Sequence, residues 1–237
     1  MQLKDSKHKK GKIINNRPHL DLLYYDPFIP RSLSQDLFHF LRSSLPFYRV
    51  SYTINRGPVA TNTVTPRFTT VFGLDATSRF DEDGRPVDAA TRTQPRREPE
   101  YTTIPPRPLP QCLEVLRNIT EKATGCTYNF CLVNYYASGF DSVAYHSDDE
   151  RFLGPNPAIA SLSLGAKRDF LLKHKPVNGK HPDGTEVLKM PLESGDMVLM
   201  RGKTQANWLH SVPKRSSSLA GGRINITFRK ALVKGGT

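Results

Sequence analysis

The sequence has few cysteines, no long apolar run and fewer acidic than basic residues, and each shortage argues against a class of protein. Its three cysteines, Cys112, Cys126 and Cys131, are odd in number and form no Cys-x-x-Cys pair. This argues against a disulfide scaffold and fits a reducing compartment. No apolar run approaches the roughly 18 residues of a transmembrane helix, so we expect no membrane association. No apolar core follows the basic N-terminus, so we expect no secretory signal.

The shortage of acidic residues leaves a strongly basic chain. Lysine and arginine number 34 against 22 aspartates and glutamates, which gives a net charge of +12. Such a chain attracts polyanions, so nucleic acid is the expected partner, although a solubilising surface would carry the same charge. The lysines within residues 1–12 suit a phosphate-binding arm, a nuclear import signal or a solvated tail. We expect a nuclear protein, with the cytoplasm as the alternative, and a monomer.

The 237 residues are enough for one domain with a substantial core. Residues 1–18 are polar and predict a disordered basic tail, which leaves residues 19–237 as a single domain. Short strands are expected within 20–25, 47–57 and 64–73. Residues 75–108 are rich in Arg, Asp and Pro, and they predict a long loop that is either a lid over a site or a flexible insertion.

The rest of the chain divides into helical and alternating patterns. Apolar spacing predicts one helix after a capping box at Ser32 and Gln35, and a second that begins near Pro108 and ends at Gly125. From Tyr128 onward the pattern alternates. Eight short strands are expected, at 129–136, 142–147, 158–164, 168–174, 186–191, 196–200, 207–212 and 222–229. They predict a mainly β, α+β domain built on a double-stranded β-helix (jelly roll), with supporting N-terminal helices.

His146 and Asp148 lie one residue apart at the end of an expected strand. Because strand side chains alternate, residues i and i+2 point the same way, so an imidazole and a carboxylate converge. A second histidine would complete the 2-His-1-carboxylate triad of non-haem Fe(II) oxygenases. His210 is preferred because it shares a strand face with its neighbours just before the C-terminal strand, and His174 is the alternative. An ordinary surface His–Asp pair would give the same local pattern.

The last expected strand, residues 223–229 (RINITFR), alternates polar and apolar side chains. Arg223, Asn225, Thr227 and Arg229 share one face. Two inward arginines would be costly without partners, but a guanidinium is a planar fork that fits a carboxylate. A dicarboxylate such as 2-oxoglutarate would occupy both, whereas an edge strand would leave both in water.

Asn134 and Tyr136 also share a strand face, and they could offer an amide and a phenol to the same anion. In chain order the motifs are Asn134-x-Tyr136, His146-x-Asp148, His210 and residues 223–229. Together they resemble the AlkB family of Fe(II)/2-oxoglutarate-dependent dioxygenases, most of all its nucleic-acid-repair branch. The residues around the motifs, at 147–150, 157–161 and 165–170, are similar as well. The resemblance covers residues 128–231 strongly and 66–73 faintly.

The resemblance implies cofactors and a reaction. The implied Fe(II) ligands are His146, Asp148 and His210. The implied 2-oxoglutarate ligands are Asn134, Tyr136, Arg223, Asn225 and Arg229. With dioxygen, 2-oxoglutarate is converted to succinate and CO2, an N-methyl group is hydroxylated, and formaldehyde leaves. The implied substrates are 1-methyladenine and 3-methylcytosine in DNA. The alternatives are an AlkB-like RNA or protein demethylase and a catalytically idle nucleic-acid-binding module on the same scaffold.

Contacts to the damaged base are also implied. Such a base is cationic and pairs poorly, so its extrusion costs less than that of a normal base. Glu150 corresponds to the acidic base-contacting position of the family and is preferred to Asp149, which alternation points away from Glu150. Tyr101 and Phe72 are candidates to stack on the base. Candidate phosphate contacts are Arg67, Lys167, Arg168, Lys173 and Lys175.

Overall fold

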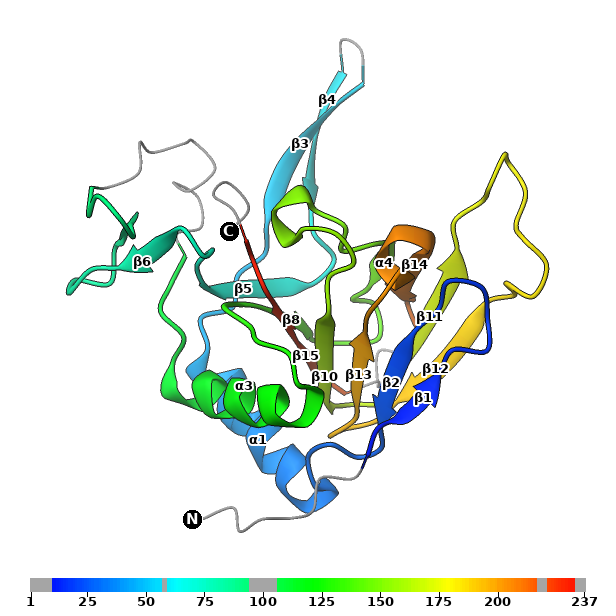
Figure 1. The fold of residues 1–237 in the computed structure, drawn as a ribbon, viewed down its shortest axis with the longest axis horizontal. Coiled ribbons are helices and arrows are strands. Elements are labelled where there is room, and N and C mark those ends of the chain that lie inside the picture. Colours follow the sequence, from blue (N-terminus) through cyan, green and yellow to red (C-terminus); the bar gives the residue numbers. More distant parts are fainter. Residues whose placement is uncertain (1–9, 57–58, 94–105, 217–220, 233–237) are drawn as a thin grey trace.

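The protein is described by a computed structural model that covers residues 10–56, 59–93, 106–216 and 221–232 (Figure 1). Two antiparallel sheets carry the fold. The larger has the strand order β1 (Lys12–Ile14), β2 (Leu22–Tyr25), β13 (Met197–Met200), β10 (Ile159–Gly165), β15 (Arg223–Arg229), β8 (Phe130–Tyr136) and β5 (Phe68–Gly73). The smaller has the order β12 (Leu188–Leu192), β11 (Arg168–His174), β14 (Trp208–Val212) and β9 (Val143–His146).

The eight strands predicted after Tyr128 are confirmed, and so is the mainly β jelly roll with supporting helices. Two apolar clusters explain how the sheets pack. Ile224, Ile226 and Phe228 of β15 point to the helical side of the larger sheet. Tyr136 of β8 packs with Phe170 and other residues of the smaller sheet. The interior between the sheets therefore receives the polar face of β15.

Helices α1 (Arg31–Ser44) and α3 (Gln111–Thr124) lie side by side and cover the outer face of the larger sheet (Figure 1). The predicted capping box is wrong, because α1 begins at Arg31 after Pro30 and no side chain caps it. Ser34 Oγ instead donates to the Arg31 carbonyl. The predicted end of the second helix is confirmed, since Gly125 caps α3 with φ of 70°. Glycine adopts this left-handed conformation without steric cost.

The expected disordered tail is partly ordered. Lys12–Ile14 forms β1 and pairs with Leu22–Tyr24, so the prediction is wrong for these residues. Their backbone hydrogen bonds hold them at the sheet edge although Ile13 is exposed. Residues 1–9 of the expected tail lie outside the described residues. Among the helices that the structure does describe, none is long and apolar enough to cross a membrane.

Two hairpins project from the core (Figure 1). The first joins β3 (Ser51–Arg56) to β4 (Val59–Val64), and β4 was not predicted. The second, β6 (Ser78–Phe80) with β7 (Pro86–Asp88), forms part of the long loop expected at 75–108. The lid role of that loop stays a prediction. A 3-10 turn η1 (Arg151–Leu153) and a short helix α4 (Thr204–Asn207) complete the described elements.

Candidate metal centre and anion pocket

The structure brings His146, Asp148 and His210 together. His146 on β9 pairs directly with His210 on β14, and their ring centroids lie 4.2 Å apart. Asp148 follows β9 by two residues, and its carboxylate lies 3.9 Å from His146 Nε2 and 3.6 Å from His210 Nε2. One ligand atom from each residue falls within 4.8 Å of the others. His174, the alternative second histidine, instead contacts His19 and the ring of Trp208.

The Asp148 carboxylate is held ionised although it is buried. Arg229 Nη2 donates a hydrogen bond of 2.9 Å to its Oδ1. Burial alone would raise the pKa of Asp148, but the charges of Arg229, His210 and His146 outweigh it and leave that pKa below its usual value. The carboxylate is therefore ready to coordinate a cation.

Both histidines are arranged for metal binding. Burial lowers the pKa of His210 to about 4, so its imidazole is uncharged at neutral pH. His146 Nδ1 lies 2.9 Å from the carbonyl of Ala144, which orients the ring and leaves Nε2 toward Asp148. Two imidazoles on neighbouring strands and a carboxylate just after β9 form the donor set that non-haem Fe(II) oxygenases use. The residues present thus fit Fe(II).

The polar face of β15 is buried in the middle of the larger sheet, between β10 and β8. This rules out the edge-strand alternative. Arg223 is 1% exposed, and its Nη2 donates to Ser163 Oγ at 2.9 Å. Its Nε and Nη1 have no hydrogen-bond partner among the described residues, and neither does Nε of Arg229. Unpaired buried guanidinium donors are costly, so they favour a bound anion.

Two asparagines and a tyrosine lie beside these arginines. Asn225 pairs with Asn134 across the β15–β8 ladder, and Arg223 pairs with Tyr136. Asn225 Nδ2 donates to Ser161 Oγ at 2.8 Å, while the guanidinium of Arg223 lies 5.3 Å from the Tyr136 ring centroid. All five predicted 2-oxoglutarate ligands therefore share one buried face, and their donors fit a dicarboxylate.

Glu150 and Asp149 occupy different surroundings next to the metal centre. Glu150 is exposed, and its Oε1 lies 3.5 Å from Arg229 Nη1. Asp149 instead pairs with Lys175 at 2.8 Å, and this hydrogen bond lowers the pKa of Asp149. Asp149 is thus occupied away from the site, whereas Glu150 borders it.

Two predicted substrate contacts, Arg168 and Phe72, are buried. Arg168 is 1% exposed and donates to the carbonyls of Ser138, Asp141 and Pro213, so its predicted phosphate contact is contradicted. Arg168 lies at a buried position of β11, so its guanidinium binds the carbonyls of neighbouring loops instead of solvent or substrate. Phe72 is 3% exposed within the helix-side core, so a stacking role is contradicted as well. Tyr101 lies outside the described residues.

Sequence reasoning missed Ser161, Ser163 and Gln205 as supports of the site and gave Arg67 a different role. Ser161 and Ser163 accept hydrogen bonds from Asn225 and Arg223, and period-two alternation along β10 could have revealed them. Arg67, expected on a phosphate, donates from Nε to Asn134 Oδ1 at 3.0 Å. Gln205 accepts a hydrogen bond from the backbone N–H of Asp148, and no local sequence pattern predicts that contact.

Comparisons with known proteins agree with this geometry. A profile of the 2OG-Fe(II) oxygenase superfamily matches residues 21–229. The DNA oxidative demethylase ALKBH2 of Homo sapiens is 43% identical over 132 residues, which cover 55% of this chain and 50% of that protein. ALKBH2 of Arabidopsis thaliana is 32% identical over 229 residues, covering 90% of this chain and 67% of that protein. The Homo sapiens alpha-ketoglutarate-dependent dioxygenase alkB homolog 3 is 45% identical over 134 residues, covering 54% of this chain and 46% of that protein.

Solved structures support the fold. The structure of OsALKBH1 matches with a TM-score of 0.53 at 19% identity, and the match covers 92% of this chain and 100% of that one. Among the curated relatives, the chain spans about half the length of the mammalian proteins it matches.

Proposed function

Because the chain belongs to the AlkB family of the 2OG-Fe(II) oxygenase superfamily, we propose that it removes methyl groups from the ring nitrogens of alkylated DNA bases. The observation that carries the proposal is the bond between Arg229 and Asp148, which joins the triad to the buried anion-binding face of β15. Such an arrangement serves a metal and an anionic cosubstrate side by side. The relatives named DNA oxidative demethylase support the choice of DNA.

Each part of the centre has a defined task. His146, Asp148 and His210 would hold Fe(II), and a neutral His210 needs to lose no proton on binding. When bound, Fe(II) with 2-oxoglutarate and dioxygen supplies the oxidation of an N-methyl carbon, with succinate, CO2 and formaldehyde as products. The buried position of the triad keeps bulk water from two of its three ligands, since Asp148 and His210 are 3% and 7% exposed.

The anion-binding face would position the cosubstrate. Arg223 has unpaired donors at Nε and Nη1, which suit a carboxylate through charge-assisted hydrogen bonds. Asn134, Tyr136 and Asn225 line the same face and would add neutral hydrogen bonds. Arg229 already donates to Asp148, so it would neutralise the metal-bound end of the site. This division assigns Arg223 to the carboxylate farther from the metal.

Glu150 would select the damaged base. It is the acidic side chain at the border of the centre that is not paired with a lysine, and it lies beside Arg229. A carboxylate there favours a cationic base such as 1-methyladenine or 3-methylcytosine over its neutral parent. The net charge of +12 supplies a general attraction to the phosphate backbone.

We also propose a cellular location and an oligomeric state. A DNA substrate and the lysine-rich residues 1–12 favour the nucleus. We propose a monomer, because the metal ligands and the anion-binding residues all come from one chain.

Formaldehyde release tests the proposed function. Metal-loaded protein is supplied with 2-oxoglutarate, ascorbate and one of three substrates: a 3-methylcytosine DNA strand, the matching RNA strand, or a methyl-lysine peptide. Release from DNA above both others supports the proposal. Release from RNA or peptide alone keeps the chemistry but overturns the substrate. Succinate without formaldehyde from any of the three would show an active centre whose substrate lies elsewhere.

A further inference from the structure

Gln205 is a buried residue that touches the backbone of a metal ligand. It lies on α4 and is 1% exposed. Its Oε1 accepts the backbone N–H of Asp148 at 2.9 Å, and its Nε2 lies 3.3 Å from Met200 Sδ. Both ends of the side-chain amide are therefore used within the protein.

This contact matters because Asp148 lacks the support that the two histidines have. His146 and His210 are paired strand residues, so the β9–β14 ladder fixes their backbones. Residues 147–150 belong to no helix or strand. The N–H of Asp148 must therefore find its partner elsewhere, since an unpaired buried donor is destabilising. Gln205 is that partner.

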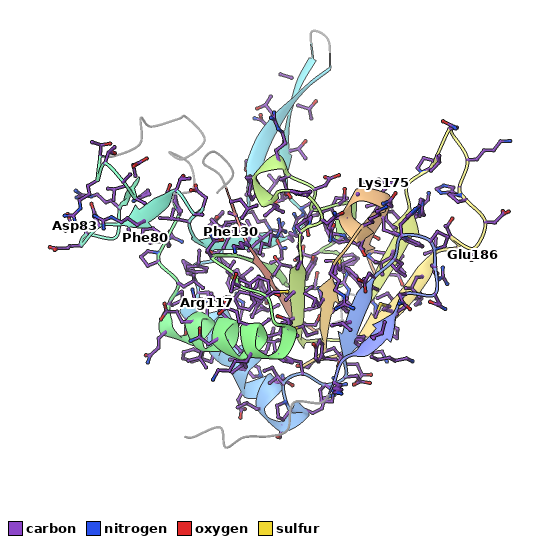
Figure 2. The ribbon with its side chains drawn as sticks, viewed as in Figure 1. Phe80, Asp83, Arg117, Phe130, Lys175 and Glu186 are labelled. Atoms are coloured by element: carbon purple, nitrogen blue, oxygen red, sulfur yellow. The ribbon has the colours of Figure 1, made fainter. Side chains whose placement is uncertain are left out.

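The helix that carries Gln205 is itself firmly anchored. Thr204 Oγ1 accepts the N–H of Asp21 at 2.9 Å, and Arg201 donates from Nε to the Asp21 carboxylate at 2.9 Å. Lys175 Nζ donates to the Gln205 carbonyl at 3.2 Å and to Asp149 at 2.8 Å. Figure 2 shows Lys175 beside this helix. Asp148 is thus bonded to α4 directly, and Asp149 is joined to it through Lys175.

We propose that Gln205 is a positioning residue that fixes the Asp148 carboxylate against His210, so that the triad is already formed before metal binds. α4 ends directly before β14, which carries His210, so one short segment holds the carboxylate and one histidine in register. The inference rests on the proposed function only in taking the triad as a metal site. The identity of the substrate does not enter it.

Metal titration of three variants tests the proposal. Gln205→Leu keeps the volume but removes the acceptor, so Co(II) should bind about 10–100-fold more weakly, as is usual when a partner of a metal ligand is lost. Gln205→Glu keeps an acceptor oxygen and should restore binding to near the wild-type affinity. Asn207→Ala removes the side-chain hydrogen bond to the carbonyl of Lys203, the residue before α4, and should leave affinity unchanged. The visible absorption of bound Co(II) should change shape in the leucine variant alone, because it reports ligand geometry.

Amide hydrogen exchange tests the proposal on the wild-type protein alone, so it does not depend on the folding of a variant. The amide hydrogen of Asp148 should exchange slowly in wild-type, metal-free protein, although its residue lies outside the strands. Fast exchange there would overturn the proposal. Equal Co(II) affinity for wild type and the leucine variant would overturn it too, and so would an equal loss in Asn207→Ala, which would point to general damage to α4. Failure of the proposed function would look different, because Co(II) would bind while no methylated base was turned over.

Discussion

Arg229 donates a hydrogen bond of 2.9 Å to Asp148, a residue 81 positions away in the sequence. Both side chains are almost completely buried, at 5% and 4% exposure. The bond crosses from β15, an interior strand of the larger sheet, to the segment that follows β9 of the smaller one. It joins the anion-binding face to the metal ligands, so a substitution of Arg229 should affect both.

Removal of Arg229 should destabilise the metal-free protein. In Arg229→Ala the buried Asp148 carboxylate loses its main cation, and breaking a buried pair typically costs about 3–5 kcal/mol. Urea unfolding of metal-free protein would measure the loss. Divalent metal should restore part of it by supplying a new cation to Asp148.

Arg215→Ala is the matched control for that experiment. Arg215 lies 3.9 Å from Asp169 and is 37% exposed, so its ion pair is screened by water. We expect a loss below about 1 kcal/mol. Losses of the same size in the two variants would contradict the assigned role of Arg229.

Replacement of Arg223 by lysine should weaken cosubstrate binding without changing metal binding. The lysine keeps the charge but cannot replace the guanidinium donors that are unpaired at Nε and Nη1. Loss of one charge-assisted hydrogen bond is worth about 1.5–3 kcal/mol, or roughly a 10–100-fold rise in the KM for 2-oxoglutarate. Succinate formation against 2-oxoglutarate concentration measures it. An unchanged KM would mean that Arg223 is a structural residue.

The stability of the metal-free protein should fall in mildly acidic solution because of His210. Burial lowers the pKa of His210 from its ordinary 6.5 to about 4. As the pH falls below 6.5, His210 binds a proton in the unfolded chain but not in the folded chain. The stabilisation from a neutral His210 is therefore complete above pH 6.5 and is lost as the pH falls toward the folded pKa of about 4. Between about pH 7 and pH 5 the loss should be about 2 kcal/mol.

His210→Gln provides the comparison, because glutamine does not titrate. Urea unfolding at the two pH values should show a smaller loss for the variant by about the stated amount. Parallel behaviour of wild type and variant would show that His210 is not held neutral. The lowered pKa of Asp148 acts at lower pH and leaves this window clear.

Glu150→Gln should reduce selectivity for cationic bases. The neutral amide keeps the shape of the exposed side chain beside Arg229 but removes the negative charge. We expect kcat/KM for 3-methylcytosine to fall about 10-fold, while a neutral alkylated base is affected less. Asp149→Asn is the control, because its carboxylate already pairs with Lys175. Equal effects of the two changes on selectivity would assign base recognition elsewhere.

The sequence predicted the metal and anion ligands better than the residues that hold those ligands in place. Alternation alone placed Arg223, Asn225 and Arg229 on one face and aligned His146 with Asp148, because strand periodicity is a local property. The resemblance supplied the order of the motifs. Local pattern could not show that β15 is an interior strand, since neighbours in a sheet come from distant parts of the chain.

The substrate contacts were predicted less well for the same reason. Arg168 and Phe72 have the residue types of a phosphate contact and a stacking platform, but tertiary packing places both in the interior. Gln205 carries no motif, and its importance depends on a contact with a residue 57 positions earlier. Ser32 has the type of a helix cap, yet Pro30 starts α1 earlier. In each case a long-range contact or a neighbouring residue outweighed the local signal.

The most direct test of the account follows the methyl group and the cosubstrate in one reaction. Wild-type protein, Fe(II), 2-oxoglutarate and a 3-methylcytosine DNA strand are combined, and mass spectrometry quantifies the repaired strand and succinate. We predict loss of the methyl group with about one succinate formed per base repaired, and neither product with His146→Ala. An unchanged strand with iron-loaded wild-type protein, or equal repair by the His146 variant, would contradict it.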